Sequence, residues 1–174
     1  MGENNTCIFA IDIGTSSVKV SVLNESGVVE ASAARPYETR HPKPGYAQQT
    51  PDDWWKAAIA CSKEIREKSL ALTRYLMELI DAELARYGFT VGNPREDARR
   101  GGHVCLEHDD AVRINEALKA ADVVPDFRYP NVIRLAPVAQ YTRFEDVYEL
   151  VRRLVEIMET KAYLNYSDKI GPVA

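Results

Sequence analysis

The residues best suited to chemistry lie close together near the N-terminus, in the stretch AIDIGTSSVK. Asp12 ends an apolar run, and its carboxylate can hold a divalent cation directly or through water. Gly14 lets the backbone approach a phosphate, which the N–H groups of a turn can then cradle. Thr15 and Ser16 add hydroxyl donors, and Lys19 adds a positive charge. The pattern predicts a phosphate site with a metal at Asp12, but an ordinary hairpin with a polar turn explains the same residues equally well.

Other polar residues in the second half of the chain predict less. His103 and His108 flank an expected strand at a spacing of five, so they share no helical face, and we do not expect them to bind a metal. Arg95, Arg99 and Arg100 are compatible with an anion site, although a solvated loop is the simpler interpretation.

The elements that must position the N-terminal residues are strands. Residues 7–13, CIFAIDI, form a short apolar run that predicts a buried strand. Residues 17–23 alternate between valine and polar residues, which is typical of a half-buried strand, and residues 28–33 follow after the turn NESG. We therefore expect a three-strand meander over residues 7–33.

One helical stretch of about 37 residues follows, although globular helices usually run roughly 8 to 20. Thr50 is suited to the N-cap, and Pro51 to the first helical position. Asp52 and Asp53 place negative charge in the first turn, where the helix dipole favours it. Nothing breaks the pattern before Gly88, which predicts the end of the helix.

The remaining half alternates short strands with helices. FTVG and HVCLE predict strands, HDDAVRINEALKAAD predicts a helix, and VIRLA is the clearest strand in the proline-limited segment that follows. Thr142 and Glu145 match a capping box at the start of the last helix. Its apolar residues recur at spacings of three and four, which predicts one buried face: Phe144, Val147, Tyr148, Val151, Leu154, Val155 and Met158.

Composition narrows the classes of function. The chain has 174 residues, 45% of them hydrophobic and 28% charged, which is ordinary for a globular protein. A net charge of −4 argues against general binding to nucleic acid or an anionic membrane surface. Cys7, Cys61 and Cys105 are too widely spaced for a disulfide framework or zinc site, so we expect a reducing, cytoplasmic location.

The motif AIDIGTSSVK between two strands resembles the first phosphate loop of the FGGY carbohydrate kinases, such as xylulokinase and glycerol kinase. HPKPGYAQQTPDDWWKAA, about 30 residues later, resembles the segment that opens a helix in the same family. The resemblance covers residues 7 to 64. It implies that Asp12, Gly14, Thr15, Ser16 and Lys19 derive from a site for the phosphates of ATP and its Mg²⁺. The family's catalytic aspartate has no counterpart here, so we expect no kinase activity.

The rest of the chain resembles the C-terminal small domain of kynureninase, a fold-type-I pyridoxal-phosphate (PLP) enzyme. Four segments carry this resemblance in order: IREKSLALTRYL, NPRE with RRGGHVCLEH, ALKAADVVPDFRYPNVIRLAPV and YTRFEDVYELVRRL. The family hydrolyses L-kynurenine to anthranilate and L-alanine in tryptophan catabolism and NAD synthesis. The resemblance implies that Arg134 is the arginine that holds the substrate's α-carboxylate, a task that suits a planar guanidinium. The lysine that binds PLP belongs to the family's large domain and has no counterpart here.

These resemblances predict an α+β chimera. Residues 1–64 would form the ribonuclease-H-like meander of a kinase, and residues 65–174 the small domain of a PLP enzyme, with the long helix joining them. We expect a chain that is not catalytic alone. The alternatives are an ATP/Mg²⁺ phosphate-binding fragment and an accessory module for a large PLP domain in trans. The meander should pack against the long helix or form a sheet between chains, so a homo-oligomer through the meander or the helix is also expected.

Overall fold

The computed structural model describes residues 8–24, 26–139 and 141–168. Cys7, at which the first strand was expected to begin, lies outside the described residues. The fold is α+β, as predicted. The chain divides into two compact units, unit 1 (residues 1–69 and 138–141) and unit 2 (residues 70–137 and 142–174).

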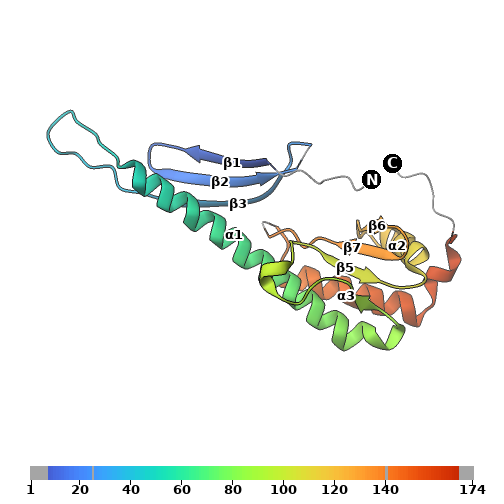
Figure 1. Ribbon diagram of the computed structural model, residues 1–174. Helices are drawn as coiled ribbons and strands as arrows, with labels where there is room; N and C mark the ends of the chain where they lie inside the picture. The colour runs from blue at the N-terminus through green and yellow to red at the C-terminus, as the bar shows by residue number, and fades with distance from the viewer. Residues whose placement is uncertain (1–7, 25, 140, 169–174) are drawn as a thin grey trace. The chain divides into compact units, whose positions relative to one another are not determined.

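Unit 1 contains a three-stranded antiparallel sheet in the order β1-β2-β3, drawn in blue in Figure 1. Its strands are β1 (Ile8–Ile13), β2 (Ser17–Leu23) and β3 (Val29–Pro36). This confirms the predicted meander. The pairing of β1 with β2 sets Asp12 opposite Lys19, and the tight turn over residues 14–16 joins the two strands.

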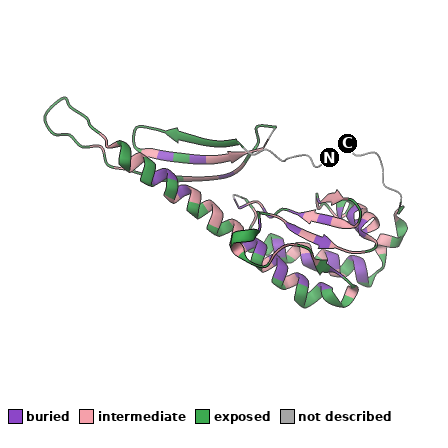
Figure 2. Cartoon of the chain, viewed as in Figure 1, coloured by how far each residue is buried: buried purple, intermediate pink, exposed green. Residues whose placement is uncertain are grey.

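The prediction that the first strand is buried was wrong. All six residues of β1 are exposed, as the green strand in Figure 2 shows. β1 lies at an edge of the sheet and pairs only with β2 among the described strands. An apolar run indicates burial only when another element covers the strand, and no described element covers this one.

A small buried cluster joins the sheet of unit 1 to the first half of the long helix. Val18 and Val20 on β2 are fully buried, and they pack with Ala57, Ala58 and Cys61 of the helix. The period-two pattern of β2 therefore marks a half-buried strand, as predicted. The expectation that the meander packs against the long helix is also confirmed.

The helical stretch runs without a break from Pro51 to Tyr87, which confirms the predicted start and end. It consists of α1 (Pro51–Leu79), a π-helical turn (Ile80–Leu84) and a 3₁₀ turn (Ala85–Tyr87). Gly88 ends it with a φ of 90°, a left-handed conformation that glycine adopts without strain. Among the helices of the described residues, none is long and apolar enough to cross a membrane.

Unit 2 is a four-stranded antiparallel sheet whose one face packs on helices. The strand order is β4-β5-β7-β6. The helices are α2 (Ala111–Ala120) and α3 (Phe144–Glu159), with short 3₁₀ turns at Asp97–Arg99 and Ala162–Asn165. The strands are β4 (Thr90–Val91), β5 (Val104–Glu107), β6 (Asp126–Arg128) and β7 (Val132–Leu135).

Alternation along the strands separates a core face from a polar face. Val104, Leu106, Ile133 and Leu135 are buried in one cluster with residues of α1, α2 and α3. Because side chains alternate across a strand, the residues between them point to the other side of the sheet. We call that side the polar face, and it carries Cys105, Glu107, Asp126, Arg128, Val132 and Arg134.

The last helix begins one residue later than its capping box predicts. Its N-cap is Arg143, not Thr142, and the Arg143 N–H donates to the Asp146 carboxylate at 2.7 Å. Asp146 therefore takes the place that was assigned to Glu145. Glu145 and Asp146 are adjacent in the first turn, so the spacing to an acidic residue fits an N-cap at Thr142 as well as one at Arg143.

The predicted apolar face of α3 is also too wide. Phe144 and Tyr148 are about half exposed, at 46% and 56%. The buried residues are Val147, Val151, Leu154, Ile157 and Met158, a set that omits the first turn and includes one position the pattern missed. The helix is buried along a narrower stripe, because only one sheet face and the neighbouring helices of unit 2 pack against it.

Candidate functional site

Arg134 lies on β7, near the middle of the polar face of unit 2. Cross-strand pairing sets it opposite Cys105 on β5 and opposite Asp126 on β6. Its side chain is 22% exposed, and its guanidinium forms an ion pair with the Asp126 carboxylate. Two strands therefore fix the position of a half-buried arginine that still reaches solvent.

The Asp126 carboxylate binds two arginines at once. Besides Arg134, it accepts a hydrogen bond from the Arg128 Nε at 3.0 Å and forms an ion pair with a terminal nitrogen of the same guanidinium at 2.9 Å. Two guanidiniums thus share one carboxylate, which leaves the cluster with an excess of positive charge. The sequence gives no signal for the pair between Asp126 and Arg134, because eight residues separate them and only the β6–β7 register brings them together.

Arg134 has two titratable neighbours, Cys105 of the polar face and His103 just before β5. Burial, and then the positive charge of Arg134, hold the pKa of His103 below its ordinary value. Burial raises the pKa of the Cys105 thiol, although Arg134 opposes that shift. Both groups are therefore uncharged near neutral pH, which leaves Glu107, Asp126, Arg128 and Arg134 as the charged residues of the polar face.

Arg100 and His108 of unit 2 have structural roles. Arg100 is 5% exposed and donates to the carbonyl oxygens of Arg95 and Leu70. It therefore belongs neither to an anion site nor to a solvated loop, the two alternatives that the sequence offered. His108 bridges the end of the long helix and the start of α2, through the Tyr87 carbonyl oxygen and the Asp110 N–H. Among the described residues, no three metal-binding side chains cluster.

In unit 1, side chains from a later loop donate hydrogen bonds to the carbonyl oxygens of the turn between β1 and β2. The Tyr37 hydroxyl donates to the Gly14 carbonyl oxygen, and the Gln49 amide donates to that of Thr15. The Tyr37 N–H donates to the Ser16 carbonyl oxygen at 3.1 Å. Within the part of the chain that the structure describes, the N–H groups of Thr15 and Ser16 donate no hydrogen bond.

The structure brings together only some of the predicted phosphate-site residues. Gly14 and Thr15 line a shallow depression with Thr39, Gln49 and Trp54. Ser16 lies in the same turn but does not line the depression, and Lys19 is exposed on β2. Asp12 is exposed on β1, and among the described residues it belongs to no cluster of three or more potential metal ligands.

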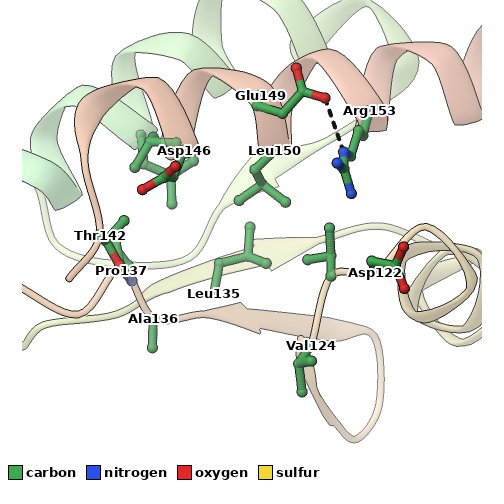
Figure 3. A pocket seen from close by; sticks show the side chains of 13 residues that line it. Asp122, Val124, Leu135, Ala136, Pro137, Thr142, Asp146, Glu149, Leu150 and Arg153 are labelled. Atoms are coloured by element: carbon green, nitrogen blue, oxygen red, sulfur yellow. Dashed lines mark hydrogen bonds and ion pairs between the residues drawn. The ribbon is translucent and has the colours of Figure 1, made fainter. Parts of the chain in front are cut away.

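A separate cleft in unit 2 contains none of the predicted site residues. Figure 3 shows it between α3, the end of β7 and the loop after α2. The polar groups along its α3 side are already paired. Glu149 accepts a hydrogen bond from Arg153 at 3.0 Å, and Asp146 accepts one from Arg143 at 3.1 Å. This cleft therefore offers little unpaired charge for a ligand.

Comparison with known families decides what unit 2 is. The family model described as the kynureninase C-terminal domain matches residues 65–154. The chain belongs to this family. A second model, the N-terminal domain of the FGGY family of carbohydrate kinases, matches residues 7–82. Together the two matches fit a chimera of these families, as predicted. They overlap over residues 65–82, so the division between residues 64 and 65 stays a prediction.

Curated kynureninases match the same half of the chain. The chain is 51% identical over 112 residues to the kynureninase of Geobacillus thermodenitrificans. The aligned segment covers 64% of this chain and 26% of the relative. The kynureninase of Bacillus anthracis matches with the same figures, and that of Shouchella clausii is 49% identical over 117 residues, 67% of this chain and 27% of the relative. The chain thus spans about a quarter of the length of the curated relatives it matches.

Kynureninases as a family use PLP as their cofactor. The polar face of this kynureninase C-terminal domain is better suited to bind a carboxylate than to attach PLP. Arg134 can offer parallel N–H donors to a carboxylate. None of the six residues of the polar face is a lysine to which PLP could attach, and Lys119 of α2 is exposed and pairs with Glu116 at 2.9 Å. The polar face could therefore supply substrate contacts but not the attachment of the cofactor.

Proposed function

We propose that unit 2 is the carboxylate-recognition half of a kynureninase and that the chain has no catalytic activity by itself. In this proposal Arg134 holds the α-carboxylate of L-kynurenine. A large domain supplied in trans binds PLP, which provides the electron sink for cleavage of the substrate side chain. The observation that carries the proposal is the position of Arg134, half-buried on a strand that is paired on both sides and held by Asp126.

The chemistry of Arg134 fits this role. A guanidinium that is already oriented loses little entropy when it binds a carboxylate, so it can both bind and align the substrate. Asp126 restrains the guanidinium on one side, while Arg128 takes part of the carboxylate's charge. Arg134 therefore keeps enough positive charge to attract a second carboxylate, that of the substrate.

The proposal is tested by adding the full chain to a kynureninase that lacks its small domain and measuring anthranilate release from L-kynurenine with PLP. We expect no product from the chain alone and turnover from the mixture. Arg134→Ala should raise KM far more than it lowers kcat. Arg86→Ala is the matched control, because Arg86 is an exposed arginine of unit 2 outside the polar face. Anthranilate from the purified chain alone, or no association with the large domain, would contradict the proposal.

A second candidate function rests on the turn of unit 1. The carbonyl oxygens of the turn are held by Tyr37 and Gln49, so the N–H groups of Thr15 and Ser16 remain available for a phosphate of ATP. Asp12 would hold Mg²⁺ through water, and Lys19 would add positive charge nearby. Mg-ATP should then raise the melting temperature of the chain, and Thr15→Pro, which removes one N–H, should abolish that shift. No shift at millimolar Mg-ATP would exclude this function.

We also propose a cytoplasmic location, on the ground that the cysteines show no paired spacing. Fractionation of cells that express the chain would test it, and recovery outside the cytoplasmic fraction would contradict it.

A further inference from the structure

Strand β1 leaves a continuous apolar surface open to solvent. Phe9 and Ile11 line a groove with Trp55, Ile59 and Ala58 of α1. Phe9 is 52% exposed, Ile11 42%, Trp55 63% and Ile59 38%. All of these residues belong to unit 1. The open surface is therefore a property of that unit by itself.

The backbone of β1 is open as well. The strand pairs with β2 on one side, and no other described strand pairs with it. An edge strand of this kind presents a row of free N–H and C=O groups. Natural edges are usually protected by proline, lysine or a bulge, but the sequence IFAIDI contains none of these, and its pairing with β2 is regular. Asp12 is its only charged residue.

From this edge we infer that unit 1 dimerises with a second copy of the chain, β1 pairing antiparallel with the β1 of its partner about a two-fold axis at Ile11. This register sets Phe9 opposite the partner's Ile13, and Ala10 opposite the partner's Asp12. The apolar residues of both copies then lie on one face of a continuous six-stranded sheet. A shift of the axis to Asp12 would set two carboxylates directly opposite each other, which is unfavourable.

The area available agrees with a dimer. Phe9, Ile11, Ile13, Trp55 and Ile59 are between 38% and 63% exposed. At roughly 200 Å² for a large apolar side chain, they expose about 500 Å² in each copy. Two copies would cover at most about 1,000 Å² in total, which is about the smallest area expected of a biological interface and fits a weak, reversible dimer. The β1–β1 backbone hydrogen bonds are additional. A self-complementary strand needs no other partner, because one surface supplies both sides of the contact.

The test is the mass of the full chain in solution, measured by sedimentation from about 1 to about 200 μM, where interfaces of this size should dissociate. We expect twice the monomer mass of 19.5 kDa at the upper end. Ile11→Lys places like charges opposite each other on the axis and should weaken the dimer at least about tenfold. Ile11 is already exposed, so unit 1 should still fold, and circular dichroism checks this.

Val29→Lys is the matched control, because Val29 is 39% exposed on β3, the other edge of the same sheet. It should leave the dimer intact. Hydrogen exchange of the unmodified chain gives an independent measurement, since the β1 amides that face away from β2 should become protected only at high concentration. A monomer at every concentration would overturn the inference. So would a dimer that Ile11→Lys leaves intact, or one that Val29→Lys dissociates.

Discussion

The buried cluster of unit 1 is so small that truncating one of its side chains should measurably destabilise the unit. Val20 is fully buried on β2 and packs with Ala57, Ala58 and Cys61. Val20→Ala removes two methyl groups, worth about 1.5 kcal/mol at about 0.8 kcal/mol each. The cavity that remains raises the cost to about 2 kcal/mol in the free energy of unfolding of unit 1. Among the described residues only five form this buried cluster, so little neighbouring structure can collapse into the space.

Hydrogen exchange followed by NMR measures this cost locally. A loss of about 2 kcal/mol corresponds to amides of β2 and β3 that exchange about 30-fold faster through opening of unit 1. Val104→Ala is the matched control, since Val104 is also a fully buried strand valine, but in the larger cluster of unit 2. It should accelerate exchange in β5 and β7 instead. The reasoning fails if Val20→Ala accelerates β2 less than about threefold, or accelerates β5 as much as β2.

Three further predictions concern unit 2. Gly88→Ala should cost about 1–2 kcal/mol and lower the melting temperature, because an L-residue is strained at a φ of 90°. Hydrogen bonds from Arg152, and then from Arg153, lower the pKa of Glu149 to about 2 from 4.5. The free energy of unfolding should therefore include this contribution above pH 4.5 and lose it as the pH falls toward 2. Glu149→Gln should remove that part of the acid dependence in urea titrations. Arg134→Ala should raise the pKa of His103, measured by NMR, although burial keeps it below its ordinary value; an unchanged pKa would show that the guanidinium does not act on the imidazole.

Local patterns predicted most elements of this chain correctly, because their causes are local. The long helix begins at Pro51 and ends before Gly88, as the cap, the first-turn charges and the glycine indicated. The meander and the strand order within it follow from period-two alternation and short turns. Each of these signals acts within a few residues, so a sequence contains all the information that they need.

The failures concern burial, which depends on what else is present. β1 is apolar but exposed, because neighbouring strands or helices that could cover it are not among the described residues. Phe144 and Tyr148 fit the helical spacing but lie beyond the width of the surface that α3 covers. Arg100 was expected in a solvated loop, although it is one of three buried polar or charged residues in the described part of the chain. In each case the pattern gave the element correctly, and tertiary packing decided how much of it is buried.

The candidate site shows the same difference between what local sequence signals predict and what only the tertiary structure determines. The sequence pointed to Arg134 only through its resemblance to kynureninase, since one strand arginine has no distinctive spacing. Asp126, which orients Arg134, could not be found this way, because the pair exists only in the β6–β7 register. The turn of unit 1 was found from its residues, but the side chains that fix its carbonyl oxygens, Tyr37 and Gln49, come from a later loop.

The segment of α1 where the two families meet is held together differently from the rest of the helix. Both family models match residues 65–82, yet residues 62–71 contain no buried side chain. Packing therefore contributes little there, and local energetics must maintain the helix. The sequence meets this need with good helix formers, and the Glu64 carboxylate forms an ion pair with Arg35 of β3. A continuous helix at this junction therefore depends mainly on helix propensity and on a few tertiary contacts, such as Arg35 with Glu64 and Arg100 with the Leu70 carbonyl oxygen. This explains how fragments of two families can share one helix.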